Sequence, residues 1–387
     1  MKKSLVALAV FGAFSGAALA QSNVTLYGIV DVNYQYNNPK ESTGCRTAPV
    51  NFNNLTGQPV SAGTATCDTT SGINSGHQSG SRWGVRGSEA LGGGLNAIFT
   101  LEGGYNIDTG TTGQTGTNAG ARLFGRQAWA GLQGNWGAVV AGRIALLSSG
   151  TGSFDIWGNV DPFLTGFGDS GLQNTFSSSN ALRVDNAIGY VSPTWGGFKG
   201  GVMYSFNVDG AEVAGSGNNT RALDIGGSFT WGGLYVAATY DIVYLPNSVG
   251  GDDQTHLQVG ATYDFKFVKL HGAWGQEKNQ RVLSTVGAIP AINNGVSADM
   301  WMVGVTVPLF GGQLLGSYQS RNGDRAQVTA TTYYEADVSV WAVGYTYPLS
   351  RRTNLYASWS DKNAEKSINA VTTLDRSQFT LGMRHLF

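Results

Sequence analysis

Charged residues are scarce in this 387-residue chain, because Asp, Glu, Lys and Arg together make up only 13% of it. That share is about half of what an ordinary soluble domain carries. The 24 basic and 25 acidic residues nearly cancel, so no basic excess points to a nucleic-acid partner. After Gln21, no run approaches the roughly 20 consecutive apolar residues that a membrane-spanning helix needs. The composition therefore argues against a nucleic-acid-binding protein and against a helical membrane protein.

Signals for a catalytic or metal site are also missing from the sequence. The four histidines, His77, His256, His271 and His385, lie in unrelated segments and share no metal-site spacing with the 2 cysteines. No G-x-S-x-G motif marks a nucleophile. We therefore expect no metal, no cofactor and no enzymatic activity.

The first residues of the chain have the features of a secretory signal. Lys2 and Lys3 precede an apolar run over residues 5–14, and Ala18-Leu19-Ala20 supplies the small residues that signal peptidase needs before Gln21. We predict that residues 1–20 are removed and that residues 21–387 form the mature protein as a single domain.

Export bears on the two cysteines, Cys45 and Cys67, which lie in one polar stretch after the first predicted strand. An oxidising compartment favours a disulfide between them, worth on the order of 3 kcal/mol in the chain-entropy model. Two free thiols are the alternative.

Apolar and polar residues alternate along many segments with a period of two. Val24, Leu26 and Val30 share one face of the first such segment, while Thr25 and Asp31 lie on the other. This period is typical of β-strands with one apolar and one polar face. In a secreted β-sandwich the apolar faces would be buried, whereas in a membrane barrel they would face lipid and the polar faces would line water. The alternation alone leaves both architectures open.

The connections between these segments favour the barrel. Short connections rich in Gly and aromatic residues, such as residues 91–94 and 231–234, take turns with long polar stretches, such as residues 37–81 and 278–297. Tight turns at one end and long loops at the other are typical of outer-membrane barrels, and a sandwich has no reason for this asymmetry. Counting the segments predicts an all-β fold, a 16-stranded antiparallel transmembrane β-barrel.

The last segment of the chain supports a closed barrel. Phe379, Leu381, Met383 and Phe387 fall on one face of it, and Phe387 ends the chain. An open sheet edge would leave unpaired backbone groups in hydrocarbon, so a barrel needs a final strand that closes it. We expect Phe387 to lie on that strand, with the apolar face toward lipid.

Four segments resemble the trimeric general-diffusion porins of beta-proteobacteria. They are residues 21–34 (QSNVTLYGIVDVNY), 81–102 (SRWGVRGSEALGGGLNAIFTLE), 125–144 (GRQAWAGLQGNWGAVVAGRI) and 382–387 (GMRHLF). The resemblance implies an outer-membrane homotrimer in contact with lipid and lipopolysaccharide. It also implies a water-filled channel for passive diffusion of small hydrophilic solutes and ions. Residues 147–180 would then be the third outer loop, folded inward to narrow the pore.

Strand parity gives candidate residues on the wall of that pore. Arg82 and Arg86 share one face of the second predicted strand, opposite the apolar Trp83, so the arginines belong to the lumen. Arg126 and Arg143, on the fourth and fifth strands, are further candidates for the lumen.

The predicted inward loop carries both acidic residues and aromatic anchors. Its carboxylates are Asp155, Asp161 and Asp169, and its aromatic residues include Phe154, Trp157, Phe163 and Phe167. We expect the aromatic side chains to hold the loop against the wall. The hypothesis for the constriction is an arginine row that faces loop carboxylates, with a slight preference for anions.

Two other functions are compatible with the sequence. A substrate-specific channel would line a sugar or organic-acid path with aromatic residues, and its transport would saturate with one solute. A barrel that serves only as an adhesin or anchor would show no conductance.

Overall fold

The computed structural model describes most of the chain from Asn23 to Phe387. The described residues are 23–40, 50–52, 59–62, 69–116, 120–164, 166–176, 183–248, 251–282, 292–324, 326–327, 333–334, 337–365 and 375–387. The predicted signal peptide and both cysteines, Cys45 and Cys67, lie outside these described residues.

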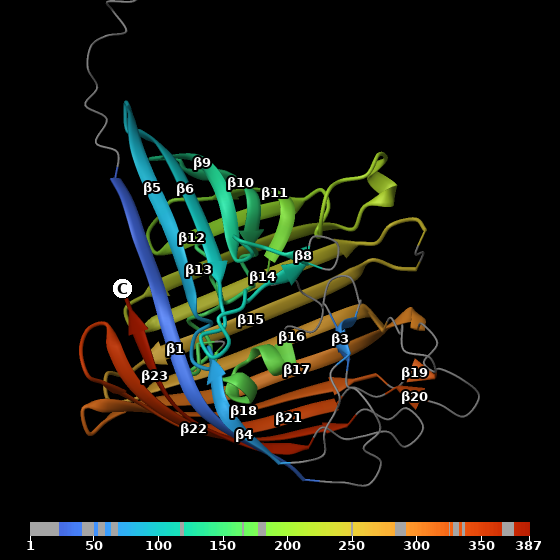
Figure 1. The fold of residues 1–387 in the computed structure, drawn as a ribbon. Coiled ribbons are helices and arrows are strands. Elements are labelled where there is room, and N and C mark those ends of the chain that lie inside the picture. Colours follow the sequence, from blue (N-terminus) through green and yellow to red (C-terminus); the bar gives the residue numbers. More distant parts are fainter. Residues whose placement is uncertain are drawn as a thin grey trace, which may run out of the picture.

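Seventeen of the described strands form one antiparallel sheet that curls into a barrel (Figure 1). They are β1 (Asn23–Pro39), β4 (Thr70–Ser75), β5 (Arg82–Gly92), β6 (Leu95–Gly104), β9 (Gln127–Gly134), β10 (Gly137–Ala145), β11 (Arg183–Val191), β12 (Phe198–Ser205), β13 (Arg221–Trp231), β14 (Leu234–Tyr244), β15 (Gln254–Asp264), β16 (Lys269–Val282), β17 (Ile292–Leu309), β18 (Gly312–Gly323), β21 (Asp337–Pro348), β22 (Thr353–Glu365) and β23 (Arg376–Leu386). β4 and β5 both pair with β1, along residues 32–37 and 23–29, so these two strands share one position in the wall. The barrel therefore has sixteen strand positions, as predicted.

Six shorter described strands form three small two-stranded sheets outside the barrel wall. They are β2 (Val50–Phe52) with β3 (Pro59–Ala62), β7 (Thr115–Gly116) with β8 (Gly120–Ala121), and β19 (Ala326–Gln327) with β20 (Tyr333–Tyr334).

The two ends of the chain close the barrel. β1 and β23 pair in an antiparallel ladder that runs from Ile29 opposite Leu386 to Pro39 opposite Arg376. Gly28 and the terminal Phe387 extend it, because each donates its backbone N–H to the other's carbonyl at 3.1 Å. First and last strands thus satisfy one another's backbone groups, which matters because an unpaired group in hydrocarbon costs several kcal/mol.

The alternating faces are oriented as a membrane barrel requires. On β15, Val259 and Tyr263 are 40% and 45% exposed, whereas the neighbouring Gln258 and Thr262 are 2% and 3% exposed. A soluble sandwich would show the opposite, with apolar side chains buried and polar ones in water. The apolar faces therefore look outward, and the membrane-barrel prediction is confirmed.

Short and long connections lie at opposite ends of the barrel. Short turns such as residues 195–197, 232–233 and 310–311 gather at the end where β1 begins and the C-terminus lies (Figure 1). Gly196 and Gly197 have φ values of 57° and 93°, which side-chain-bearing residues rarely adopt. These backbone conformations explain the Gly-rich short connections in the sequence.

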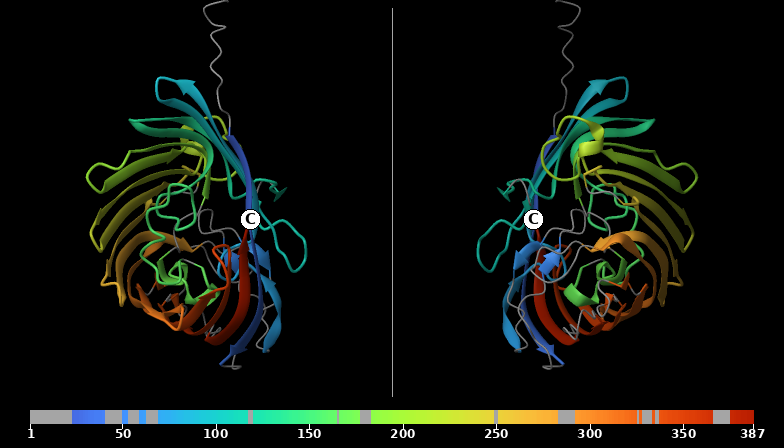
Figure 2. Two further views of the ribbon diagram at one scale, coloured as in Figure 1. Left: turned by 90° about the vertical axis from the view of Figure 1, so that its left-hand side faces the viewer. Right: turned by 90° about the vertical axis from the view of Figure 1, so that its right-hand side faces the viewer.

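The connection between β10 and β11 folds into the barrel (Figure 2), as the predicted third loop should. Within it lie the one-turn 3-10 helix η1 (Gly168–Ser170) and the short α2 (Gln173–Phe176), and a third short helix, η2 (Ser216–Asn218), joins β12 to β13. Over the described ranges, no helix has the length and apolar character needed to cross a membrane. We call the described residues 146–164 and 166–176 the inward loop.

Candidate functional site

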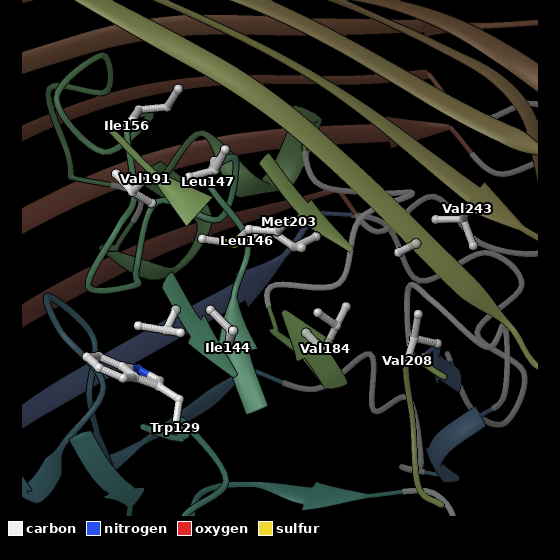
Figure 3. Close-up of a cluster of buried hydrophobic side chains, with 13 residues drawn as sticks. Trp129, Ile144, Leu146, Leu147, Ile156, Val184, Val191, Met203, Val208 and Val243 are labelled. Atoms are coloured by element: carbon white, nitrogen blue, oxygen red, sulfur yellow. The ribbon is translucent and has the colours of Figure 1, made fainter. Parts of the chain in front are cut away.

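The inward loop begins on a cluster of buried apolar side chains at the end of β10. Ile144, Leu146 and Leu147 pack there with Val184 of β11 and Met203 of β12 (Figure 3). All five side chains are at most 4% exposed. Burying an aliphatic side chain of this size stabilises by about 2 kcal/mol, so the cluster fixes the point where the chain leaves the wall.

Two further apolar clusters hold the body of the inward loop. Trp157 and Phe176 pack with Met300 and Met302 of β17. Phe163 and Phe167 pack with Tyr356 of β22, and the Phe167 and Tyr356 rings meet edge to face with centroids 5.4 Å apart. Phe154 packs against the first cluster, 5.3 Å from the Trp129 ring. The predicted role of the aromatic residues as anchors is confirmed.

The carboxylates of Asp155 and Asp161 hold turns within the loop itself. Asp155 accepts backbone N–H groups from Gly150 at 2.8 Å and from Trp157 and Gly158 at 2.9 Å. Burial raises the pKa of Asp155, and these three hydrogen bonds oppose that rise. Asp161 likewise accepts two backbone N–H groups of the loop, at 2.9 and 2.7 Å.

Asp169 ties the inward loop to the barrel wall. Its carboxylate accepts two hydrogen bonds from Arg376 of β23, one of them at 2.6 Å, and Lys362 of β22 lies 3.7 Å away. Burial alone would raise the pKa of Asp169, but the two cations outweigh it and hold the pKa below its ordinary value. All three aspartates therefore have partners that hold the loop in place.

A buried row of charged groups runs behind the loop, across four neighbouring strands and on to β18. Asp224, Asp241, His256 and Glu277 lie opposite one another in register on β13 to β16. His256 is 3.5 Å from Asp241 and 3.7 Å from Glu277, and Arg321 of β18 is 2.6 Å from Glu277. We call these five residues the charged row. In the part of the chain that the structure describes, no group of three or more His, Cys, Asp or Glu could hold a metal ion.

The charged row binds both ends of the inward loop. At its first end, the Leu147 N–H donates to Asp224 at 2.6 Å and the Ser148 hydroxyl donates to Asp241 at 3.1 Å. At its other end, Arg321 donates to a backbone carbonyl of α2 at 3.4 Å. These contacts thus fix where the loop leaves the wall and hold α2, the last part of the loop that the structure describes.

Arginines gather on the wall opposite these anchors. Arg126 donates from Nε to Glu102 at 2.7 Å, and Arg82 lies 4.0 Å from the same oxygen. The Tyr27 hydroxyl donates to the second Glu102 oxygen at 2.9 Å, and the Arg86 guanidinium lies 5.0 Å from the centre of the Tyr27 ring. Arg82, Arg86 and Arg126 therefore share one neighbourhood, whose carboxylate comes from the wall strand β6.

Arg143 belongs to a different group of charges. It lies 2.5 Å from Asp185 and donates from Nε to the Gly125 carbonyl at 2.7 Å. Arg122 donates to Asp185 at 2.9 Å and also pairs with Asp209. Arg143 is thus largely balanced by nearby carboxylates.

A cavity of about 530 Å³ lies between the arginine wall and the inward loop. Arg82, Arg126 and Arg183 line it from the wall, and Gly150 and Thr151 line it from the loop. Its described lining contains no Asp or Glu, so the three loop aspartates do not border it. We call this space the constriction cavity.

Arg183, at the start of β11, is a lining residue that the sequence analysis missed. It donates from Nη2 to the Thr151 hydroxyl at 3.1 Å, and within the described ranges no carboxylate lies within the 4.0 Å of an ion pair. The register of β11 shifts between Val184 and Ala187, so the alternation is broken between Arg183 and the exposed Ile188. Strand parity therefore gave no reliable signal for Arg183.

Residues 5–367 match the sequence profile of the Gram-negative porin family. The chain belongs to this family. The porin is 33% identical to an outer membrane porin protein of Bordetella pertussis, in an alignment that covers 100% of both chains. It is 32% identical to outer membrane porin protein 32 of Delftia acidovorans over 92% of this chain and 88% of that relative.

Solved structures share the fold of the porin. The anion-selective porin from Comamonas acidovorans superposes with a TM-score of 0.66 at 24% identity, covering 95% of this chain and 100% of that one. Salmonella typhi OmpF superposes with a TM-score of 0.63 at 14% identity, over 94% and 97% of the two chains. At these identities the comparison concerns the fold alone.

Family and fold together give the function. The porin is an outer-membrane channel through which small hydrophilic solutes and ions diffuse passively, and it is not an enzyme. The inward loop narrows a barrel of this strand number, which would otherwise enclose a wide aqueous channel. The predictions of fold, location and transport class are confirmed.

Proposed function

We propose that this porin is a general-diffusion channel with a preference for anions, set at the constriction cavity. The observation that carries the proposal is the described lining, which contains Arg82, Arg126 and Arg183 but no Asp or Glu, while Glu102 pairs with Arg126 outside it. A guanidinium at roughly 8 Å from a passing ion, with an effective dielectric near 40, contributes about 1 kcal/mol. Glu102 offsets about one of these three charges, and the remaining two attract an anion and repel a cation by a few times thermal energy. The porin of Comamonas acidovorans that shares this fold is itself anion-selective.

The loop carboxylates modify the charge arrangement that the sequence suggested. Asp155 and Asp161 are engaged by backbone N–H groups, and Asp169 is paired with cations of β22 and β23. We infer that they position the loop, and that the arginine wall sets the sign of the field. Arg86 and Arg143 border neither described cavity and contribute from a greater distance.

Reversal potentials test the ionic part of the proposal. Purified porin is placed in a planar bilayer with a tenfold KCl gradient across it. The sign of the reversal potential should show that chloride is more permeant than potassium. A potential near zero, or one of the opposite sign, would refute the anion preference.

Liposome swelling tests the general-diffusion part. Rates that fall smoothly with solute mass indicate diffusion limited by size. Saturation by one sugar or organic acid would favour the substrate-specific channel instead. The described lining of the constriction cavity contains no Trp, Tyr or Phe, which argues against an aromatic sugar path.

The assembled form is also part of the proposal. We propose a homotrimer in lipid and lipopolysaccharide, made of residues 21–387 after removal of residues 1–20, with a Cys45–Cys67 disulfide. Cross-linking of outer membranes should yield a trimer, and the mass of the purified chain should equal that of residues 21–387. Two reactive thiols in the unreduced, denatured protein would rule out the disulfide.

A further inference from the structure

A second cavity, of about 540 Å³, lies between the inward loop and the short-turn end of the barrel. It shares Gln78 and Leu164 with the constriction cavity, so the two spaces are consecutive along the pore. Its lining includes the turns and strand ends at residues 308–313, 346–354 and 384–386. We call it the lower cavity.

Basic side chains outnumber acidic ones in the described lining of the lower cavity. The basic residues are Lys269, Arg351, Arg352 and Arg384, and the one acidic residue among those described is Asp161. Both carboxylate oxygens of Asp161 already accept backbone N–H groups of the loop. The described lining residues therefore have a formal charge of +3.

The four cations have no carboxylate within 4.0 Å among the residues that the structure describes. Arg384 is held by neutral partners, since it donates to Asn354 at 3.1 Å and to the Ser79 hydroxyl at 3.0 Å. The turn that bears Arg351 and Arg352 is held by the Ser350 hydroxyl, which accepts two backbone N–H groups at 3.1 Å each. The lining thus offers four cations that no carboxylate pairs directly, with Asp31 attracting Arg384 and Asp264 attracting Lys269 over a longer distance.

We propose that the lower cavity is a binding subsite for small multivalent oxyanions, such as tricarboxylates, that enter from the short-turn side. Guanidinium groups donate paired hydrogen bonds that match a carboxylate. A space of this volume lies in the range of ordinary small-molecule sites. Each cation attracts a trivalent anion about three times as strongly as it attracts chloride, so the trivalent anion should stay in the cavity longer than chloride does. The inference rests on the proposed anion preference, because the ligand must reach an open pore of that sign.

One-sided block in a planar bilayer tests this subsite. Porin added from one compartment inserts with its short-turn end leading, because the long polar loops cannot readily cross hydrocarbon. Citrate is added to either compartment while chloride current is recorded. We expect citrate on the short-turn side to reduce the current at a lower concentration than citrate on the loop side. Equal block from the two sides, or none from either, would overturn the proposal.

Variants assign the block to named residues. The Arg351→Gln/Arg352→Gln double variant should raise the half-blocking citrate concentration by roughly fivefold to tenfold, because each lost charge acts on a trivalent ion. Lys266→Gln is the matched control, since Lys266 lies in another short turn at the same end and borders neither cavity. Lys269→Gln provides a second lining variant. Wild-type block in both lining variants would overturn the assignment.

The same recordings separate this inference from the proposed function. A wild-type reversal potential without anion preference would refute the proposed function, whatever citrate does. A clear anion preference together with block that has no sidedness would refute only the subsite.

Discussion

Replacing Arg183 with Gln is expected to weaken the anion preference of the porin. Arg183 borders the constriction cavity and is held by the Thr151 hydroxyl, and no described carboxylate pairs with it. The substitution therefore removes a charge that is not balanced locally. Gln can still donate a hydrogen bond toward the loop, so the change is mainly electrostatic.

The size of the effect follows from Coulomb attraction reduced by salt. One charge at roughly 8 Å in a dielectric of about 40 to 80 contributes about 0.5 to 1 kcal/mol before screening. The Debye length of about 10 Å in 0.1 M salt reduces this by roughly half. Since the field acts oppositely on chloride and potassium, the permeability ratio should fall by about twofold to fivefold. In 1 M salt, where the Debye length is about 3 Å, the effect should nearly vanish.

Reversal potentials under a KCl gradient measure this ratio directly. The Arg183→Gln variant should shift the potential toward zero by roughly 10 mV at low salt. Arg221→Gln is the matched control, because Arg221 begins a nearby strand, stacks on Tyr244 and borders neither cavity. An unchanged potential for Arg183→Gln, or an equal shift for both variants, would refute the reasoning.

Three further predictions concern how the inward loop is held. Phe163→Ala removes a fully buried ring, which costs about 3 to 5 kcal/mol in a packed core; liposome swelling should then admit larger sugars, and an unchanged exclusion limit would contradict the anchoring role. Glu277→Gln removes the negative charge 2.6 Å from the buried Arg321, which should cost about 3 kcal/mol; heat denaturation should occur at a lower temperature than in wild type, and equal transition temperatures would argue that the charged row does not stabilise the loop. The lowered pKa of Asp169 means that its ion pairs stabilise the loop above the ordinary pKa of 3.8 and are lost as the pH falls through the lower folded value. Current noise of the wild type should therefore rise in strong acid, whereas the Asp169→Asn variant should be noisy already at neutral pH. Equal noise of the two proteins at every pH would contradict this.

The sequence by itself determined the fold class of this protein and the alternation of short and long connections between its strands. Period-two alternation, such as that along β15, fixes which side chains share a face, because consecutive residues of a strand point to opposite sides. Short Gly-rich turns and long polar connections then predict the even strand count and the two unlike ends. The aromatic anchors of the inward loop, among them Trp157 and Phe163, also followed, since a loop inside a barrel must pack against its wall.

The charge arrangement at the constriction depended on contacts between distant segments. The parity of Arg82 and Arg126 could be read locally, but their partner Glu102 comes from another strand. Arg183 could not be placed in this way, because the register of β11 shifts after Val184, and only the cavity shows that Arg183 faces Thr151 of the loop.

Only the tertiary structure decided what the buried charges do. Nothing along the chain relates Asp224, Asp241, His256 and Glu277, which register places side by side on four strands. Likewise, Asp169 meets Arg376 across more than two hundred residues of sequence. Local pattern fixes the face on which a side chain lies, whereas its partner is fixed by strand register and by the path of the loop, and these depend on packing of the whole barrel.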